Sequence, residues 1–133
     1  MSEGSHIVCH ERRVLVVEDT PAVRQLLVLA LTDEGYRVQA AVHGAHALQL
    51  LETLAPCLIL LDLRMPVLDG YGFARAYRAR DDADAHLIVM TAEARPGPLD
   101  AIKPVQVVRK PFDLEHLLPN VEHWVRAHPS RAA

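Results

Sequence analysis

Five short runs of aliphatic and β-branched residues, separated by longer stretches, constrain what this 133-residue chain can fold into. A strand with helices packed on both of its faces is apolar along its length, whereas a half-exposed strand alternates. Most of the runs are almost wholly apolar, and they occupy residues 14–17, 36–42, 57–61, 86–90 and 105–109. Such strands, alternating with helical patterns, predict an α/β fold with a parallel sheet covered on both faces.

Helical patterns fill most of the stretches between these runs. Thr20 and Pro21 are suited to the N-cap and first position of a helix, and Gly35 ends the apolar repeat that follows them. The same spacing of apolar residues predicts further helices over residues 45–54, over residues 72–80, and from a cap at Asp113 to about residue 127.

Prolines disturb this alternation at two places. The stretch between the fourth and fifth runs contains residues that disfavour helical backbone, namely Pro96, Gly97, Pro98 and Pro104. We therefore expect the fourth of five helices to be short or missing. Pro119 lies inside the last helical pattern, where it costs about 3 kcal/mol unless the helix kinks. We expect a break near Leu118.

Charge and hydropathy exclude several classes of protein. The chain has 14 lysines and arginines against 17 acidic residues, a formal charge of −3. It therefore lacks the cationic field that holds nucleic acid, and we expect no direct nucleic-acid contact. The longest uncharged apolar stretch, residues 54–61, falls far short of the roughly 20 residues that span a bilayer. Residues 1–13 lack the apolar core of an export signal. We expect no membrane contact and a cytoplasmic location.

The expected organisation is one domain over residues 13–127, between a flexible leader of residues 1–12 and a tail of residues 128–133. Cys9 and Cys57 fit neither a disulfide framework nor a CxxC site, so we expect reduced thiols. No output domain is expected after residue 127, which leaves open a stand-alone protein or a piece of a longer one.

Polar residues close four of the predicted strands. In an open parallel sheet the carboxyl ends of the strands meet at the edge where ligands bind, which brings together Glu18, Asp19, Asp62, Thr91 and Lys110. Three neighbouring carboxylates repel one another unless a cation balances them. Oxygen ligands without cysteine or histidine favour Mg²⁺. A metal, an ammonium and a hydroxyl could surround a phosphoryl group, with Asp62 the best-placed nucleophile.

These residues stand in motifs that resemble the receiver domain of bacterial two-component response regulators, in the mould of the chemotaxis regulator. The resemblance covers about residues 13–127. It is carried by Val-Leu-Val-Val-Glu-Asp at 14–19, Leu-Leu-Asp-Leu-Arg-Met-Pro-Val-Leu-Asp-Gly at 60–70, Thr91-Ala92 and Lys110-Pro111-Phe112. The set is highly specific because all four motifs occur in the family's order.

The resemblance implies a flavodoxin-like, doubly wound (βα)5 fold with strand order 2-1-3-4-5. Asp62 would accept a phosphoryl group from the phosphohistidine of a sensor histidine kinase or phosphotransfer protein. Mg²⁺ would be bound by Asp19, Asp62 and the backbone carbonyl of Arg64, with Glu18 helping through water. Thr91 and Lys110 would bind the phosphoryl group, and the Lys110-Pro111 peptide would be cis. Such a domain assists its own phosphorylation and dephosphorylation but is not a conventional turnover enzyme.

The sequence departs from the receiver pattern near its output face. Val107 stands where receivers usually carry a tyrosine or phenylalanine that swings inward on phosphorylation, and Lys103-Pro104 replaces a Gly-Ala pair. An aliphatic side chain cannot report by ring movement, so we expect an atypical readout. Arg64 and Glu93 stand where the family tunes the lifetime of the acyl phosphate. Two separate solvent-facing charges are favoured slightly over an ion pair.

Two alternatives remain open at this stage. A Mg²⁺-dependent phosphatase acting through an aspartyl intermediate would need an Asp-x-Asp motif, and Arg64 replaces its second acid. A pseudo-receiver, which only binds partners, would fit the missing aromatic ring but not the intact acidic, threonine and lysine set. We expect a kinase or phosphotransfer protein and an unknown downstream protein as partners, and a monomer or an atypical dimer.

Overall fold

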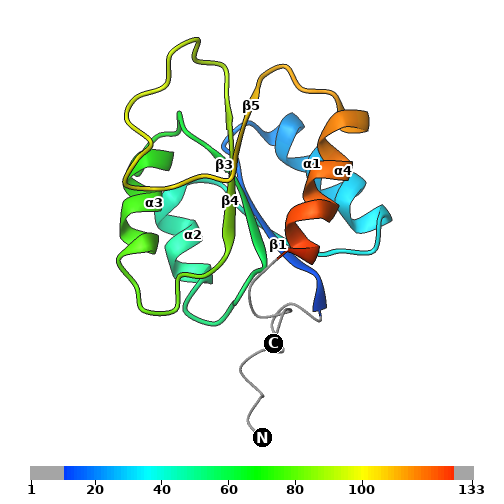
Figure 1. Cartoon of the computed structure of the whole chain (residues 1–133), viewed down its shortest axis with the longest axis horizontal. Helices are drawn as coiled ribbons and strands as arrows, with labels where there is room; N and C mark the ends of the chain where they lie inside the picture. Colours follow the sequence, from blue (N-terminus) through cyan, green and yellow to red (C-terminus); the bar gives the residue numbers. More distant parts are fainter. Residues whose placement is uncertain (1–10, 128–133) are drawn as a thin grey trace, which may run out of the picture.

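The computed structural model describes residues 11–127, which form a five-stranded parallel sheet with the order β2-β1-β3-β4-β5 (Figure 1). The predicted α/β class and strand order are confirmed. The predicted leader, except for residues 11 and 12, and the predicted tail lie outside the described residues, as does Cys9. The strands are β1 (Arg13–Val17), β2 (Arg37–Ala41), β3 (Leu58–Asp62), β4 (His86–Thr91) and β5 (Gln106–Arg109).

Helices cover both faces of the sheet. Figure 1 shows α2 and α3 on one face and α1 and α4 on the other, so the sheet is doubly wound. The second helix ends at Leu50, before the predicted residue 54, and the third begins at Gly70, before the predicted residue 72. The bounds are α1 (Pro21–Asp33), α2 (Gly44–Leu50), α3 (Gly70–Arg78) and α4 (Leu114–Arg126).

The central strand β3 divides the hydrophobic core into two halves. Every residue of β3 is buried, which explains why its sequence shows no alternation. Successive side chains point to opposite faces. Ile59 and Leu61 therefore pack with α2 and α3, while Leu58 and Leu60 pack with α1 and α4. Packing on both faces holds β3 in place, and with it the position of Asp62 at the carboxyl end of the strand.

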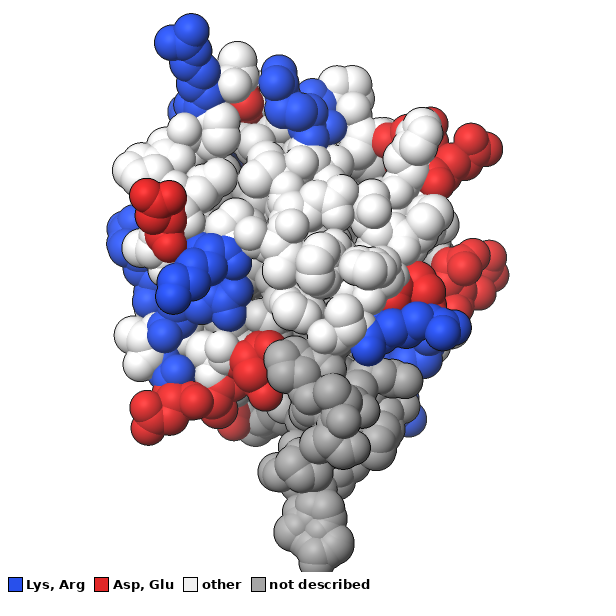
Figure 2. Space-filling model, in the orientation of Figure 1, with Lys and Arg blue, Asp and Glu red and all other residues white. Residues whose placement is uncertain are grey.

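The expected fourth helix is missing. Within the described part of the chain, residues 92–105 form turns and irregular backbone, as their prolines predict. Strand β5 is the last in the sheet order, so one of its long edges has no neighbouring strand. Figure 2 shows that the centre of the face presenting β5 carries no lysine, arginine, aspartate or glutamate, and that charged side chains lie around its margin.

The last helix is continuous, so the predicted break near Leu118 is wrong. Helix α4 runs through Pro119 to Arg126. Proline removes one backbone hydrogen bond from the helix. Leu117, Val121 and Val125 lie fully buried against the sheet on the opposite side of this helix from exposed Pro119. We attribute the unbroken helix to that packing, because tertiary contacts outweigh the loss of a single bond.

Aspartates cap two of the helices. Asp113 caps α4 as predicted, since its carboxylate accepts a hydrogen bond from the amide of Glu115 at 2.9 Å. Asp69 caps α3 by accepting from the amide of Gly72 at 2.8 Å. Thr20 occupies the N-cap position of α1, but its side chain makes no capping hydrogen bond. Pro21 at the first position still pre-sets the helical backbone there.

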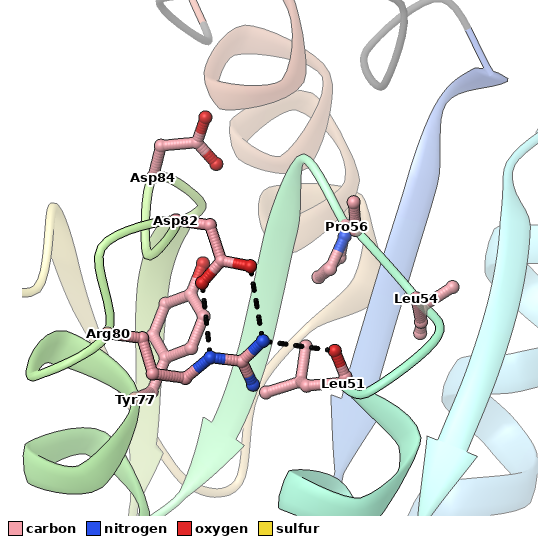
Figure 3. Close-up of a pocket in the computed structure, with 8 residues that line it drawn as sticks. Leu51, Leu54, Pro56, Tyr77, Arg80, Asp82 and Asp84 are labelled. Carbon is pink, nitrogen blue, oxygen red and sulfur yellow. Dashed lines mark hydrogen bonds and ion pairs between the residues drawn. The ribbon is translucent and has the colours of Figure 1, made fainter. Parts of the chain in front are cut away.

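The loops at the amino ends of β3 and β4 are held together by Arg80. Figure 3 shows its guanidinium bonded to the carboxylate of Asp82 and to the carbonyl of Leu51. The Nε–Oδ1 distance to Asp82 is 3.1 Å. The hollow beside it, also lined by Tyr77 and Pro56, lies at the end of the sheet opposite the predicted site. Arg80 therefore has a structural role.

The loop after β3 contains a strained valine. Val67 has a φ of 71° and is 80% exposed, so it adopts left-handed backbone with little packing in return. Val67→Gly should raise the free energy of unfolding by about 1 kcal/mol, measured by urea denaturation. The matched control is Val107→Gly on the extended edge strand, which should lower it. Equal losses in both variants would contradict this account.

Candidate functional site

Three carboxylates gather at the carboxyl ends of two neighbouring strands. Glu18 and Asp19 follow β1, and Asp62 ends β3. The register pairs Val17 with Leu61, which brings the next residues of each strand together. One carboxylate oxygen from each acid lies within 4.8 Å of the others. Glu18 has no exposed surface and Asp62 is 4% exposed, so little water screens their repulsion.

Lys110 supplies a cation that contacts two of these carboxylates. Its Nζ lies 2.8 Å from Oε1 of Glu18 and 3.6 Å from Oδ2 of Asp62. The lysine is placed from the edge of the sheet, where its backbone amide donates to the carbonyl of Thr91 at 2.8 Å. The Lys110-Pro111 peptide is cis, as the resemblance implied. One ammonium against three carboxylates leaves the cluster anionic.

The turn between β1 and α1 is fixed by hydrogen bonds to its backbone. Arg24 donates to the carbonyls of Glu18 and Asp19 at 2.8 and 3.2 Å. The amide of Thr20 donates to Oε2 of Glu18 at 3.2 Å, so both oxygens of this buried carboxylate are bound. Asp19 is thereby held at the mouth of the site with its side chain partly exposed.

Asp62 is destabilised as an anion. Burial, and then the charge of Glu18, raise its pKa to about 6, against the opposing effect of Lys110. Its Oδ1 accepts a hydrogen bond from the amide of Arg64 at 3.3 Å. At neutral pH the carboxylate is still ionised, and its charge would be better balanced with a further cation nearby.

Gly70 allows α3 to begin directly against the end of β3. A Cβ on this residue would lie 2.3 Å from the carbonyl oxygen of Asp62 and 2.7 Å from Cα of Leu63. The amide of Gly70 donates to the carbonyl of Leu63 at 3.0 Å. The glycine that ends the 60–70 motif therefore serves the close approach of backbone beside Asp62.

Thr91 is buried at the end of β4, and its hydroxyl is bound to Glu93. The hydroxyl accepts from the amide of Glu93 at 3.0 Å and donates to its Oε1 at 3.4 Å. Since β4 pairs with β3, Thr91 lies beside the strand that carries Asp62. The structure thus places the threonine at the predicted edge of the sheet, but its hydroxyl is bonded to Glu93 and not to the acidic cluster.

Glu93 forms an ion pair with Arg64, so the preference for two separate charges was wrong. Arg64 Nη1 lies 2.8 Å from Oε2 of Glu93, and this contact is the main cause that lowers the pKa of Glu93. The hydroxyl of Tyr71 donates to Oε1 of the same carboxylate at 3.1 Å. Sequence reasoning missed Tyr71, because a tyrosine in the first turn of a helix carries no motif that would single it out.

The donor set fits a hard divalent cation. Glu18, Asp19 and Asp62 offer carboxylate oxygens from the ends of two adjacent strands. Mg²⁺ binds such oxygens and retains several of its waters. The partly exposed Asp19 leaves room for those waters at the mouth of the site. The cluster that the sequence predicts from strand ends is therefore present in the structure.

A sequence profile of the response regulator receiver domain matches residues 14–122. This chain belongs to the response regulator receiver family. The receiver has the phosphoacceptor role in two-component signalling systems, and the motifs that carried the resemblance all lie within the matched range.

Two curated relatives match most of this receiver. It is 34% identical over 119 residues to the DNA-binding dual master transcriptional regulator RpaA of Synechocystis sp.. It is 38% identical over 118 residues to the response regulator MprA of a Mycobacterium species. Each match covers 86% of this chain but only 49% and 50% of the relatives. The chain thus spans about half the length of the curated relatives it matches.

A solved response regulator has a similar fold over almost all of its own length. The response regulator TrrA from Thermotoga maritima, in complex with Mg²⁺ and BeF, superposes with a TM-score of 0.75 at 32% identity. The match covers 85% of this chain and 98% of TrrA.

The expectation that excluded nucleic acid from the partners is overturned by these relatives. RpaA is a DNA-binding regulator, and this receiver matches only half of it. The reasoning failed because the net charge of a receiver says nothing about an attached DNA-binding region.

Among residues 11–127 no helix combines the length and the hydropathy needed to cross a bilayer.

Removing the buried carboxylate of Asp62 should stabilise the metal-free receiver. The folded-state pKa of Asp62 is raised, so its ionisation weakens the fold increasingly as pH rises through about 4 to 6. Asp62→Asn should add roughly 1–2 kcal/mol to the free energy of unfolding near pH 7.5 in chelator, and almost nothing near pH 4. The exposed Asp100→Asn is the control, and urea denaturation is the measurement. A gain that persists at the lower pH would disprove the explanation.

Proposed function

We propose that Asp62 is the phosphoacceptor of this receiver. The observation that supports this most strongly is its position in the carboxylate cluster, 3.6 Å from Lys110 Nζ. Glu18 is the other clustered acid beside this lysine, but both of its oxygens are already bound, by Lys110 and by the amide of Thr20. Its Oδ1 is held by the amide of Arg64, which fixes the direction in which the carboxylate faces. A buried, oriented and poorly balanced anion is suited to attack phosphorus once its charge is offset.

We assign the metal ligands to Glu18, Asp19, Asp62 and the backbone carbonyl of Arg64, with Mg²⁺ as the ion. When bound, Mg²⁺ would offset the negative charge of the carboxylates and of the phosphoryl oxygens. Glu18 is already paired with Lys110 at 2.8 Å, so it would bind the ion through water. Asp19 provides the accessible oxygen at the mouth of the site.

The chain's own residues would position the reacting groups. An oxygen of Asp62 attacks the phosphorus of a kinase phosphohistidine, the new O–P bond forms, and the P–N bond breaks to release the imidazole. Lys110 moves its ammonium from the carboxylates toward a phosphoryl oxygen. Thr91 turns its hydroxyl from Glu93 to donate to another. Thr91 ends β4, which is the neighbour of β3, and Lys110 follows β5, so both residues start from the edge of the sheet at which Asp62 lies.

The proposed chemistry is a single transfer per signal, with no catalytic turnover of a substrate. Arg64 stands where an aspartyl phosphatase would need its second acid, and its guanidinium is engaged with Glu93. The intact cluster with Lys110 argues against a phosphorylation-independent pseudo-receiver.

The cytoplasmic location remains a prediction from the sequence.

Phosphorylation by a small donor tests this assignment. The full chain incubated with acetyl phosphate and Mg²⁺ should gain one phosphoryl group, detected by intact mass spectrometry. Asp62→Asn should lose the adduct completely, because its amide is not a nucleophile toward phosphorus. Asp100→Asn, which removes an exposed acid outside the cluster, should retain it. Lys110→Ala should slow adduct formation by an order of magnitude or more.

Two other results would redirect the assignment. Many phosphates released per protein molecule would indicate a phosphatase. A chain that stays unmodified at saturating donor and Mg²⁺ would indicate a pseudo-receiver.

A further inference from the structure

Position 107 carries no ring that could report the state of Thr91. Val107 lies on the edge strand β5 and is 40% exposed. The structure offers a different aromatic residue on the other side of the site. Tyr71, in the first turn of α3, reaches the residue to which Thr91 is bound.

Glu93 is the centre of a network that joins three elements. Its carboxylate accepts from Arg64 on the loop after β3, from Tyr71 on α3 and from Thr91 at the end of β4. Its backbone amide donates to the Thr91 hydroxyl as well. Thr91 is fully buried, so turning its hydroxyl elsewhere would leave this amide to find a new partner. The position of Glu93 therefore depends on the orientation of Thr91.

Tyr71 extends this network to the irregular segment of residues 92–104. Its hydroxyl accepts a hydrogen bond from the amide of Gly97. A Cβ on Gly97 would lie 3.3 to 3.4 Å from the hydroxyl and ring atoms of Tyr71, so the ring packs on the backbone of this residue. The tyrosine hydroxyl thus bridges Glu93 and Gly97. It lies beside a cleft of about 600 Å³ between α3 and the segment, which Arg75, Pro98 and Ile102 also line.

The segment has few hydrogen bonds of its own to hold it in place. It contains no helix. Its far end is anchored, because Ile102 and Lys103 donate to the carbonyl of Leu99 and their own carbonyls accept from Arg78 on α3. The contact with Tyr71 fixes its middle at Gly97. A change at Tyr71 would therefore be felt along the segment more strongly than in the well-packed strands.

We propose that Tyr71 is the positioning residue through which this receiver transmits the state of Thr91 to residues 92–104, in place of a ring at position 107. The inference rests on the proposed phosphoacceptor role of Asp62. A phosphoryl group draws the Thr91 hydroxyl away from Glu93, repels the Glu93 carboxylate and competes for Arg64. Tyr71 then loses its acceptor, its bond to Gly97 loosens, and the segment opens beside the cleft.

Fluorine NMR of the full chain with 3-fluorotyrosine tests the first step. The chain has three tyrosines, Tyr36, Tyr71 and Tyr77, so three resonances are expected. Addition of Mg²⁺ and beryllofluoride, a stand-in for the phosphoryl group, should shift the Tyr71 resonance, assigned by its loss in Tyr71→Phe. The other two should stay in place, because Tyr36 bonds to Glu122 and Tyr77 to the amide of Ala85.

Hydrogen exchange measured by mass spectrometry tests the second step. In the wild type, beryllofluoride should raise exchange in residues 94–101 several-fold. In Tyr71→Phe, exchange there should already be high and should not change on addition. Tyr36→Phe, which removes a hydroxyl in a different network, should behave as the wild type does. Bound beryllofluoride gives its own fluorine resonance, which reports occupancy of Asp62 in every sample.

The outcomes separate the two proposals. Bound beryllofluoride with an unmoved Tyr71 resonance, or with equal exchange responses in the wild type and Tyr71→Phe, would overturn the role of Tyr71 and leave that of Asp62 intact. If no beryllofluoride binds to the wild type, the phosphoacceptor assignment fails and the inference falls with it.

Discussion

The buried contact between Lys110 and Glu18 is the interaction on which the functional end of this receiver depends. Glu18 is fully buried, and a buried carboxylate without a partner would cost several kcal/mol. The 2.8 Å contact joins the residue after β1 to the residue after β5, although β3 and β4 lie between these two strands in the sheet. It does not neutralise the site, because Asp19 and Asp62 add two further charges. The excess negative charge favours the binding of a cation, which would in turn offset the charge of an incoming phosphoryl group.

Much of this arrangement could be predicted because strand ends in a parallel sheet have a fixed location. Uniformly apolar runs predicted the buried strands, and the acids that follow them predicted the cluster. Tertiary packing was not visible in the same way. Pro119 signalled a break that the burial of Leu117, Val121 and Val125 overrides. The pair of Arg64 with Glu93 joins loops from two strands, and no periodicity records such a contact.

The missing helix between β4 and β5 changes which parts of the receiver can respond to the site. A packed helix would hold residues 92–104 by its own hydrogen bonds, whereas here one tyrosine hydroxyl holds Gly97. The proposed role of Tyr71 would account together for two departures from the receiver pattern, the aliphatic residue at 107 and the proline-rich connection. Little free energy is needed to displace a segment held by so few contacts. A change in the hydrogen bonds to Glu93 is enough to displace it.

Magnesium titration of the metal-free receiver tests the central claim about charge most directly. The melting temperature should rise with Mg²⁺ concentration and then level off, because an ion that binds the folded cluster stabilises it by mass action. Asp19→Asn, which removes one acid without touching the contact between Lys110 and Glu18, should respond far less. A melting temperature that ignores Mg²⁺, or an equal rise in the wild type and Asp19→Asn, would contradict the claim that these carboxylates form a cation site.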